Sequence, residues 1–211
     1  MNPNLGAIIA PSNGLSGLNE FWLKRAVFLL CLTPLAWLLA QALLGALGAN
    51  PIETIIRYLG DWALRLLLLT LTATPLRRLT GWGWPVRLRR MLGLFTFFYA
   101  VLHLLAYALL DQFFDWVAIW EDIVERPFIT TGMLAWLLLL ALALTSNQTS
   151  QRRLGRNWKR LHRLIYPAAI LAVVHFTLMV KADLREPLIY GAILTLLLGL
   201  RLIRRQGVQN P

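Results

Sequence analysis

Six long apolar segments constrain this chain more than any other feature of its sequence. They cover about residues 26–47, 55–74, 91–110, 128–144, 161–180 and 188–203. Each approaches or exceeds the roughly 17 residues that a helix needs to cross the hydrocarbon core of a bilayer. The chain is 58% hydrophobic, with a mean hydropathy of +0.60, whereas a soluble domain is usually about 45–50% apolar. The segments therefore predict an all-α membrane protein, a bundle of six transmembrane helices forming a single domain over residues 1–211.

The charged residues between these segments predict the orientation of the bundle. Arginine and lysine are concentrated in the connections after the second and fourth segments and at the end of the sixth. The connections after the third and fifth segments are acidic or nearly neutral. Basic connections of membrane proteins stay in the cytoplasm. The alternation therefore places both termini in the cytoplasm of a multi-pass membrane protein.

Other interpretations of the composition are less favoured. Residues 1–20 are rich in Gly, Asn, Ser and Pro and are typical of a flexible tail. A cleaved signal peptide competes for residues 26–47, but that run is long enough to span and more spans follow. The net charge of +11 would suggest a nucleic-acid partner in a soluble protein, whereas here it marks orientation. No nucleotide-binding glycine motif occurs, and the single cysteine, Cys31, excludes an intramolecular disulfide or a cysteine-ligated cluster.

Three histidines are the strongest functional signal within the apolar segments. An ionisable side chain is costly in hydrocarbon and marks a functional site by default, and histidine is a frequent axial ligand of haem iron. His103 lies 13 residues beyond Arg90, and His175 lies 13 residues beyond His162. Arg90 and His162 mark the inner edges of two spans that run in the same direction. His103 and His175 are therefore expected at one depth in the outer half of the membrane, as two axial ligands of a haem.

The third histidine is expected to lie apart from this pair. His162 belongs near the inner surface, level with Arg89 and Arg90, whose guanidinium groups can pair with haem propionates. On an ideal helix His162 and His175 are about 140° apart, although Pro167 can kink the helix between them. A second haem at His162 would need water, another side chain or no sixth ligand. A zinc site is disfavoured because the three histidines are spread over about 20 Å of depth.

Two stretches of the sequence resemble a known family. Arg89–Leu94, followed by His103 and Tyr107, is similar to the third span of the ferric reductase/NADPH oxidase-like transmembrane domain. Trp158–Tyr166, followed by His175, is similar to its fifth span. Six spans without a nucleotide-binding domain resemble, more narrowly, the MsrQ (YedZ) family of haem-binding membrane subunits. The larger oxidases carry two histidines on each of these spans, whereas this chain has an arginine at the inner position of the third.

The resemblance implies a function in electron transfer. Members sit in the bacterial inner membrane, bind haem b and take electrons from the quinone pool. They pass the electrons to MsrP, a periplasmic molybdopterin enzyme that reduces methionine sulfoxide in oxidised proteins. Catalysis then belongs to the partner, and this chain supplies no catalytic residue. FMN binding is implied by the resemblance alone. A stand-alone metalloreductase and a proton-coupled transporter that uses the intramembrane histidines remain alternatives.

Overall fold

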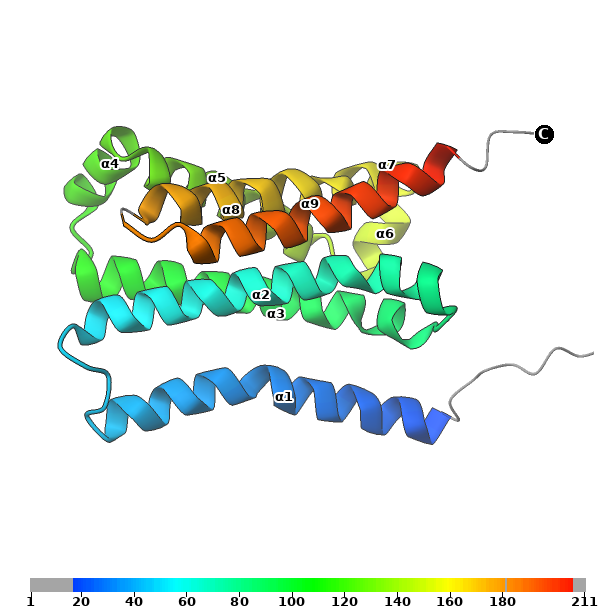
Figure 1. The fold of residues 1–211 in the computed structure, drawn as a ribbon, viewed down its shortest axis with the longest axis horizontal. Helices are drawn as coiled ribbons and strands as arrows, with labels where there is room; N and C mark the ends of the chain where they lie inside the picture. The colour runs from blue at the N-terminus through cyan, green and yellow to red at the C-terminus, as the bar shows by residue number, and fades with distance from the viewer. Residues whose placement is uncertain (1–16, 181, 207–211) are drawn as a thin grey trace, which may run out of the picture.

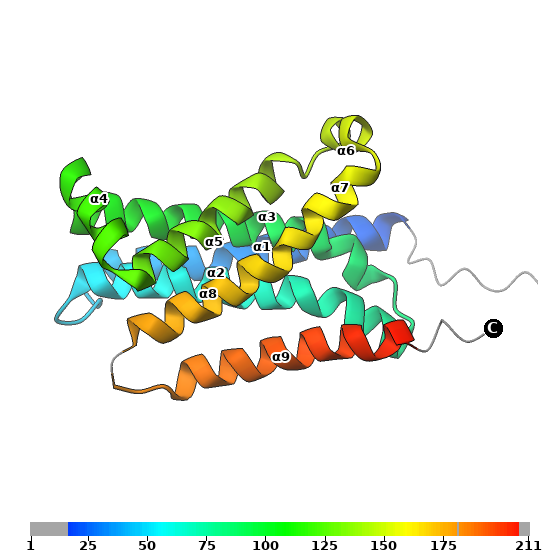
Figure 2. The same ribbon diagram turned by 90° about the horizontal axis from the view of Figure 1, so that it is seen from above.

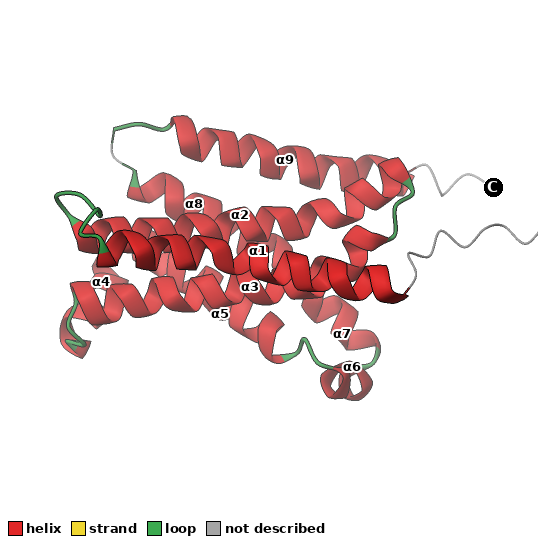
Figure 3. Ribbon diagram, turned by 90° about the horizontal axis from the view of Figure 1, so that it is seen from below, coloured by secondary structure: helices red, strands yellow, loops and turns green. Residues whose placement is uncertain are grey.

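The computed structural model describes residues 17–180 and 182–206, which form helices joined by short connections, with no strand in those ranges (Figures 1 and 3). The elements in chain order are α1 (Gly17–Leu43), α2 (Pro51–Thr80), α3 (Trp84–Ala106), the π-helical turn η1 (Tyr107–Asp111), α4 (Trp116–Glu125), α5 (Pro127–Leu144), α6 (Gln148–Leu154), α7 (Arg156–Leu161), the 3₁₀ turn η2 (His162–Leu164), α8 (Ile165–Met179) and α9 (Arg185–Gln206). The all-α prediction is confirmed for these residues.

Four stretches of the described chain are long and apolar enough to cross a membrane. They are Glu20–Leu43, Trp84–Asp111, Pro127–Leu144 and Arg156–Met179. They coincide with the first, third, fourth and fifth predicted segments. Helices α2 and α9 occupy the second and sixth predicted segments and contain 30 and 22 residues. At a rise of 1.5 Å per residue they extend about 45 and 33 Å, but they carry more charged side chains than the other four.

The long helices pack in three layers (Figure 1). Helix α1 forms one layer, α2 and α3 the middle layer, and α5, α8 and α9 the third. Helices α5 and α8 run side by side, as the view from above shows (Figure 2). One buried cluster joins α2, α5, α8 and α9 around Leu67, Leu71 and Ala168. A second cluster joins α1 to α2 and α3 around Cys31 and Tyr99.

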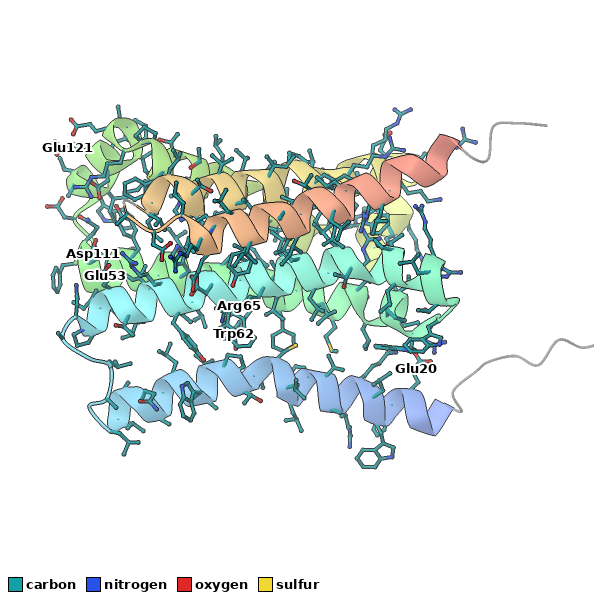
Figure 4. All side chains as sticks on the ribbon, in the orientation of Figure 1. Glu20, Glu53, Trp62, Arg65, Asp111 and Glu121 are labelled. Atoms are coloured by element: carbon teal, nitrogen blue, oxygen red, sulfur yellow. The ribbon has the colours of Figure 1, made fainter. Side chains whose placement is uncertain are left out.

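The two ends of the bundle differ in charge. We call them the α4 end and the α6 end, after the short helices found there (Figures 1 and 2). Glu53, Asp111 and Glu121 lie at the α4 end, whereas Glu20 lies at the other (Figure 4). Glu20 is held there by Lys24 at 2.9 Å and by Arg87 at 3.5 Å. Three of these four carboxylates thus lie at the α4 end, and the one at the α6 end is paired with two basic side chains.

The beginning of α1 differs from the prediction of a flexible tail over residues 1–20. Residues 1–16 lie outside the described residues. Residues 17–20 form the first turn of α1, because the Glu20–Lys24 pair spans successive turns of the helix. Farther along, the buried Tyr99 hydroxyl fastens α1 to the bundle: it donates to the Cys31 carbonyl at 2.7 Å and accepts from the Leu35 amide at 3.2 Å.

Helix α2 has clear signals at both of its ends. The Asn50 side chain accepts from the Glu53 amide at 3.4 Å, and Pro51 occupies the first turn, where its missing N–H costs nothing. Gly81 follows the helix with φ 77° and donates its amide to the Arg77 carbonyl at 2.9 Å. Few residues other than glycine adopt this left-handed conformation without strain. These signals fix a helix that is longer than the predicted segment 55–74.

Helix α2 continues through Pro75, where the sequence predicts its end. A proline leaves the carbonyl four residues earlier without its helical donor. Here that carbonyl belongs to Leu71, and it accepts a hydrogen bond of 2.5 Å from Arg201 of α9. The same guanidinium donates to the Tyr166 hydroxyl of α8, also at 2.5 Å. Arg201 therefore replaces the missing donor and ties three helices together.

We expect Arg201→Ala to lower the free energy of unfolding by about 1–3 kcal/mol, because it leaves the Leu71 carbonyl without a donor in an apolar interior. Pro75→Ala restores the backbone donor and should recover part of that loss in the double variant. Thermal unfolding in detergent measures both effects, with Arg152→Ala, an exposed change on α6, as the control. If Arg201→Ala lowers the free energy of unfolding equally with and without Pro75→Ala, Arg201 does not replace the donor that Pro75 removes.

Candidate functional site

His103 and His175 meet in the centre of the bundle. His103 lies on α3 near its last turn, and His175 lies on α8. Their ring centres are 6.1 Å apart, and the ring planes are inclined by 76°. Helices α3 and α8 are separated by more than fifty residues of sequence, so only the tertiary packing brings the two rings together. The structure thus brings together the two histidines that the sequence predicts to face each other.

Each of these two rings is held by a backbone carbonyl of the neighbouring helix. Nδ1 of His103 lies 2.8 Å from the Ile56 carbonyl oxygen of α2. Nδ1 of His175 lies 2.6 Å from the Phe128 carbonyl oxygen of α5. A carbonyl can only accept, so Nδ1 of each ring must carry the proton. In a neutral imidazole the other nitrogen then bears a lone pair, and Nε2 of each ring is available to a metal.

A cavity of about 410 Å³ surrounds the pair and extends toward the α4 end; we call it the outer cavity. Its wall is mostly apolar and includes Leu64, Leu67, Leu139 and Phe176. Trp136 also lines it, and its indole Nε1 is buried without a hydrogen-bond partner. Ligand pockets commonly enclose about 300–1,000 Å³ with few polar groups. The outer cavity has the size, the apolar wall and the buried donor of such a site.

Polar groups gather where the outer cavity approaches the α4 end. Tyr107, at the start of η1, donates to the Asp122 carboxylate at 2.7 Å. Asp122 is buried and also pairs with Arg126 at 3.0 Å. Arg126, Arg57 and Tyr107 all line the cavity. The network fixes α4 against the end of α3, and it places two guanidinium groups beside the cavity.

His162 lies in a second cavity, of about 400 Å³, nearer the α6 end; we call it the inner cavity. Its lining is strongly basic, and no lining residue is an aspartate or glutamate. The ring stacks on Trp158 at 3.9 Å between ring centres, and Nε2 lies 3.4 Å from the Ser146 hydroxyl oxygen. The basic residues of its lining are Arg89, Arg90, Lys159, His162 and Arg163. Of the two other histidines, neither lines this cavity.

The stretch that joins the two cavities is not a uniform helix. His162–Leu164 form the 3₁₀ turn η2, and α8 begins at Ile165 with Pro167 in its first turn. A 3₁₀ turn advances by about 120° per residue instead of about 100°. Over three residues this narrows the angle between His162 and His175 from about 140° to about 80°. The two rings can therefore serve adjacent cavities, which share Leu67 and Leu139 in their walls.

Sequence reasoning identified the histidines and missed the groups that hold them. The Ile56 and Phe128 carbonyls have no side-chain signal at all. Arg57 and Arg126 are not among the predicted site residues. Asp61 and Arg65, spaced one turn apart on α2, form an ion pair at 3.7 Å, and Arg65 also donates to the Tyr190 hydroxyl at 2.9 Å.

Comparison with known proteins identifies relatives over most of the chain. The family model described as "Ferric reductase like transmembrane component" matches residues 59–173. A protein named "Protein-methionine-sulfoxide reductase heme-binding subunit MsrQ" from Rhodospirillum rubrum is 60% identical, covering 89% of this chain and 93% of that protein. Relatives of the same name from Xanthomonas campestris pv. campestris (strain B100) and Xanthomonas axonopodis pv. citri are 54% and 52% identical, each covering 89% of this chain and 88% of the relative. No solved structure matches. The chain therefore belongs to the MsrQ family, within the ferric reductase-like transmembrane proteins.

Proposed function

We propose that this chain is the membrane electron-transfer subunit of a protein-methionine-sulfoxide reductase system, and that it holds haem b between His103 and His175. The observation that carries the proposal is the facing pair of imidazoles, 6.1 Å apart between ring centres. Two metal–imidazole bonds of about 2.0 Å, plus the distance from nitrogen to ring centre on both sides, together span about 6 Å. The spacing therefore suits one metal ion between the two rings.

The residues around the pair fit a haem in their chemistry. Both rings have Nδ1 tied to a carbonyl, which leaves Nε2 for the iron. The apolar wall of the outer cavity suits a porphyrin, and Arg57 and Arg126 are the guanidinium groups that could meet its carboxylates. A haem bound there supplies a one-electron ferric–ferrous couple. The protein supplies orientation, burial and the hydrogen bonds that tune the potential.

The inner cavity is the proposed place for a second cofactor. His162 offers one imidazole, and Arg89 and Arg90 offer positive charge to propionates or to another anionic group. The proposal includes a possible second haem with a single histidine ligand. FMN is proposed from family resemblance alone, without a location in this chain.

The proposed topology has six spans in the bacterial inner membrane, with α2 and α9 crossing beside the four apolar helices. Both termini and the α6 end face the cytoplasm, and the α4 end faces the periplasm. The inner cavity then lies in the cytoplasmic half of the membrane and the outer cavity in the periplasmic half. Electrons from the quinone pool would leave at the α4 end, toward a periplasmic molybdopterin reductase of the MsrP type. That partner carries out catalysis.

Replacing either outer-cavity ligand should remove most of the haem b absorbance. We expect His103→Ala and His175→Ala each to lose the low-spin spectrum, because the one remaining imidazole would not supply the two strong-field ligands that a low-spin haem needs. The measurement is the haem-to-protein ratio and the dithionite-reduced spectrum of purified protein. His162→Ala is the matched control and should keep the outer haem. Unchanged spectra in both ligand variants, or a colourless wild-type protein, would exclude the proposed site.

Electron delivery should depend on the periplasmic partner. In nanodiscs, a quinol analogue should reduce the protein, and methionine sulfoxide should reoxidise it only after the molybdopterin reductase is added. Stopped-flow spectroscopy of the haem band measures both steps. A ferric chelate tests the stand-alone metalloreductase alternative. Rapid reoxidation by the chelate, with none by sulfoxide and partner together, would favour that alternative over the proposed function.

The topology can be tested by cysteine labelling in a Cys31→Ala background. Glu121→Cys at the α4 end and Gln151→Cys at the α6 end both replace exposed residues. A membrane-impermeant maleimide should label the first variant in intact spheroplasts and the second only after lysis. The unsubstituted Cys31→Ala protein is the control for background labelling. The opposite labelling pattern would show that the α4 end faces the cytoplasm, and it would contradict the proposed topology.

A further inference from the structure

Two helix glycines lie directly against the two outer histidines. A Cβ atom built on Gly60 of α2 would lie 3.1 Å from both Nδ1 and Cε1 of His103. A Cβ atom built on Gly132 of α5 would lie 2.7 Å from Nδ1 and 2.9 Å from Cε1 of His175. For both glycines, the three nearest atoms all belong to the imidazole ring. No backbone atom of the opposing helix is among them.

The glycines occupy the same place relative to the carbonyls that hold the rings. Gly60 follows Ile56 by four residues, and Gly132 follows Phe128 by four residues. In an α-helix the Cα–Cβ bond tilts toward the N-terminus, so a side chain lies over the turn that precedes it. A Cβ at either position would therefore cover the carbonyl that accepts from Nδ1. Glycine leaves that carbonyl open on the side where the imidazole approaches.

We propose that Gly60 and Gly132 are positioning residues that set the orientation and tautomer of the two haem-ligating histidines. Each glycine opens a notch in the surface of its helix, and the ring enters the notch to donate from Nδ1 to the exposed carbonyl. The carbonyl has a second lone pair for this bond in addition to its helical partner. The inference rests on the proposed function, because the histidines must be the ligands for their orientation to matter.

The arrangement has a consequence for the electronic character of the site. A hydrogen bond from Nδ1 to a carbonyl raises the basicity of the coordinating Nε2. A more basic ligand stabilises ferric iron and lowers the midpoint potential. The notches therefore fix the orientation of the rings and lower the midpoint potential of a haem bound between them. Loss of either hydrogen bond should raise the midpoint potential.

Close packing between the helices is the competing reason for the two glycines. Small residues often allow helices in a bilayer to approach each other, and both helix pairs here, α2 with α3 and α5 with α8, pack closely. The atoms that a Cβ would meet argue against this reason, because they are ring atoms and not backbone. The two explanations also differ in a measurable way. If the ring is what requires the glycine, removing the ring should remove the requirement.

The first experiment compares Gly60→Ala and Gly132→Ala with Gly191→Ala and Gly199→Ala of α9. A Cβ at Gly191 would meet only a side-chain carbon at 3.8 Å, and a Cβ at Gly199 would meet nothing within 4 Å. We expect Gly132→Ala to lose most of its low-spin haem, because its contact is the shorter. Gly60→Ala should retain haem, with a changed low-spin EPR signal and a raised midpoint potential. The controls should match the wild type in haem content, EPR and potential.

The second experiment places Gly132→Ala and Gly191→Ala in a His175→Ala background and measures thermal unfolding in detergent. This readout requires neither bound haem nor activity. If the notch accommodates the ring, Gly132→Ala should destabilise the wild-type chain but behave like Gly191→Ala when His175 is absent. Equal destabilisation in both backgrounds would show that the glycine serves helix packing and would overturn the inference. The same design applies if Gly132→Ala does not yield folded protein in the wild-type background.

The two levels of failure are distinguishable. Wild-type haem content that survives both His103→Ala and His175→Ala defeats the proposed site itself. A wild-type bis-histidine spectrum that is unchanged in Gly60→Ala and Gly132→Ala leaves the proposed function in place and overturns only the role of the glycines. Altered EPR and potential in Gly60→Ala, with unaltered controls, supports both.

Discussion

The bonds from Nδ1 of the two outer histidines to backbone carbonyls are the interaction on which the functional geometry depends. Inside an apolar bundle, a polar ring nitrogen without a partner is costly. His103 and His175 have such partners, because Nδ1 of His103 lies 2.8 Å from the Ile56 carbonyl oxygen and Nδ1 of His175 lies 2.6 Å from the Phe128 carbonyl oxygen. Because both partners are main-chain groups of long helices, the rings inherit the rigidity of α2 and α5. The same bond fixes the tautomer of each ring and leaves the lone pair on Nε2.

Toward the α6 end, a polar side chain likewise bonds a backbone group that would otherwise have no partner. Pro75 deprives the Leu71 carbonyl of its helical donor, and the Arg201 guanidinium supplies one from α9. Tyr166 of α8 receives a second bond from that guanidinium. Tyr99 likewise enters the turn of α1 that contains Pro34, bonding the carbonyl of Cys31 and the amide of Leu35. Polar side chains of other helices thus bond the backbone of α2 at the Pro75 turn and the backbone of α1 beside Pro34.

The sequence predicts the helical class, six apolar segments of which four form helices long and apolar enough to cross a membrane, and the meeting of His103 and His175, because these follow from hydropathy and from counting along a helix. It does not predict that α2 passes through Pro75, since the compensating donor lies more than a hundred residues away. The notches at Gly60 and Gly132 are missed for the same reason. The role of an isolated glycine in an apolar helix depends on the ring that lies against it in the folded chain. The 3₁₀ turn at His162 is also missed, because counting residues along the chain assumes a uniform α-helix.

The two cavities are similar in volume but differ in the residues that line them. The outer cavity holds two rings whose centres lie 6.1 Å apart, each with its tautomer set by a backbone carbonyl. The inner cavity has one ring, which stacks on Trp158, lies 3.2 Å from the Trp158 carbonyl oxygen through Nδ1 and lies 3.4 Å from the Ser146 hydroxyl oxygen through Nε2. Its basic lining favours a bound anion over a fixed coordination geometry. Leu67 and Leu139 line both cavities, so the two cavities adjoin across apolar side chains. The outer cavity thus combines a pair of facing rings with a mostly apolar wall, whereas the inner cavity combines a single ring with a basic lining.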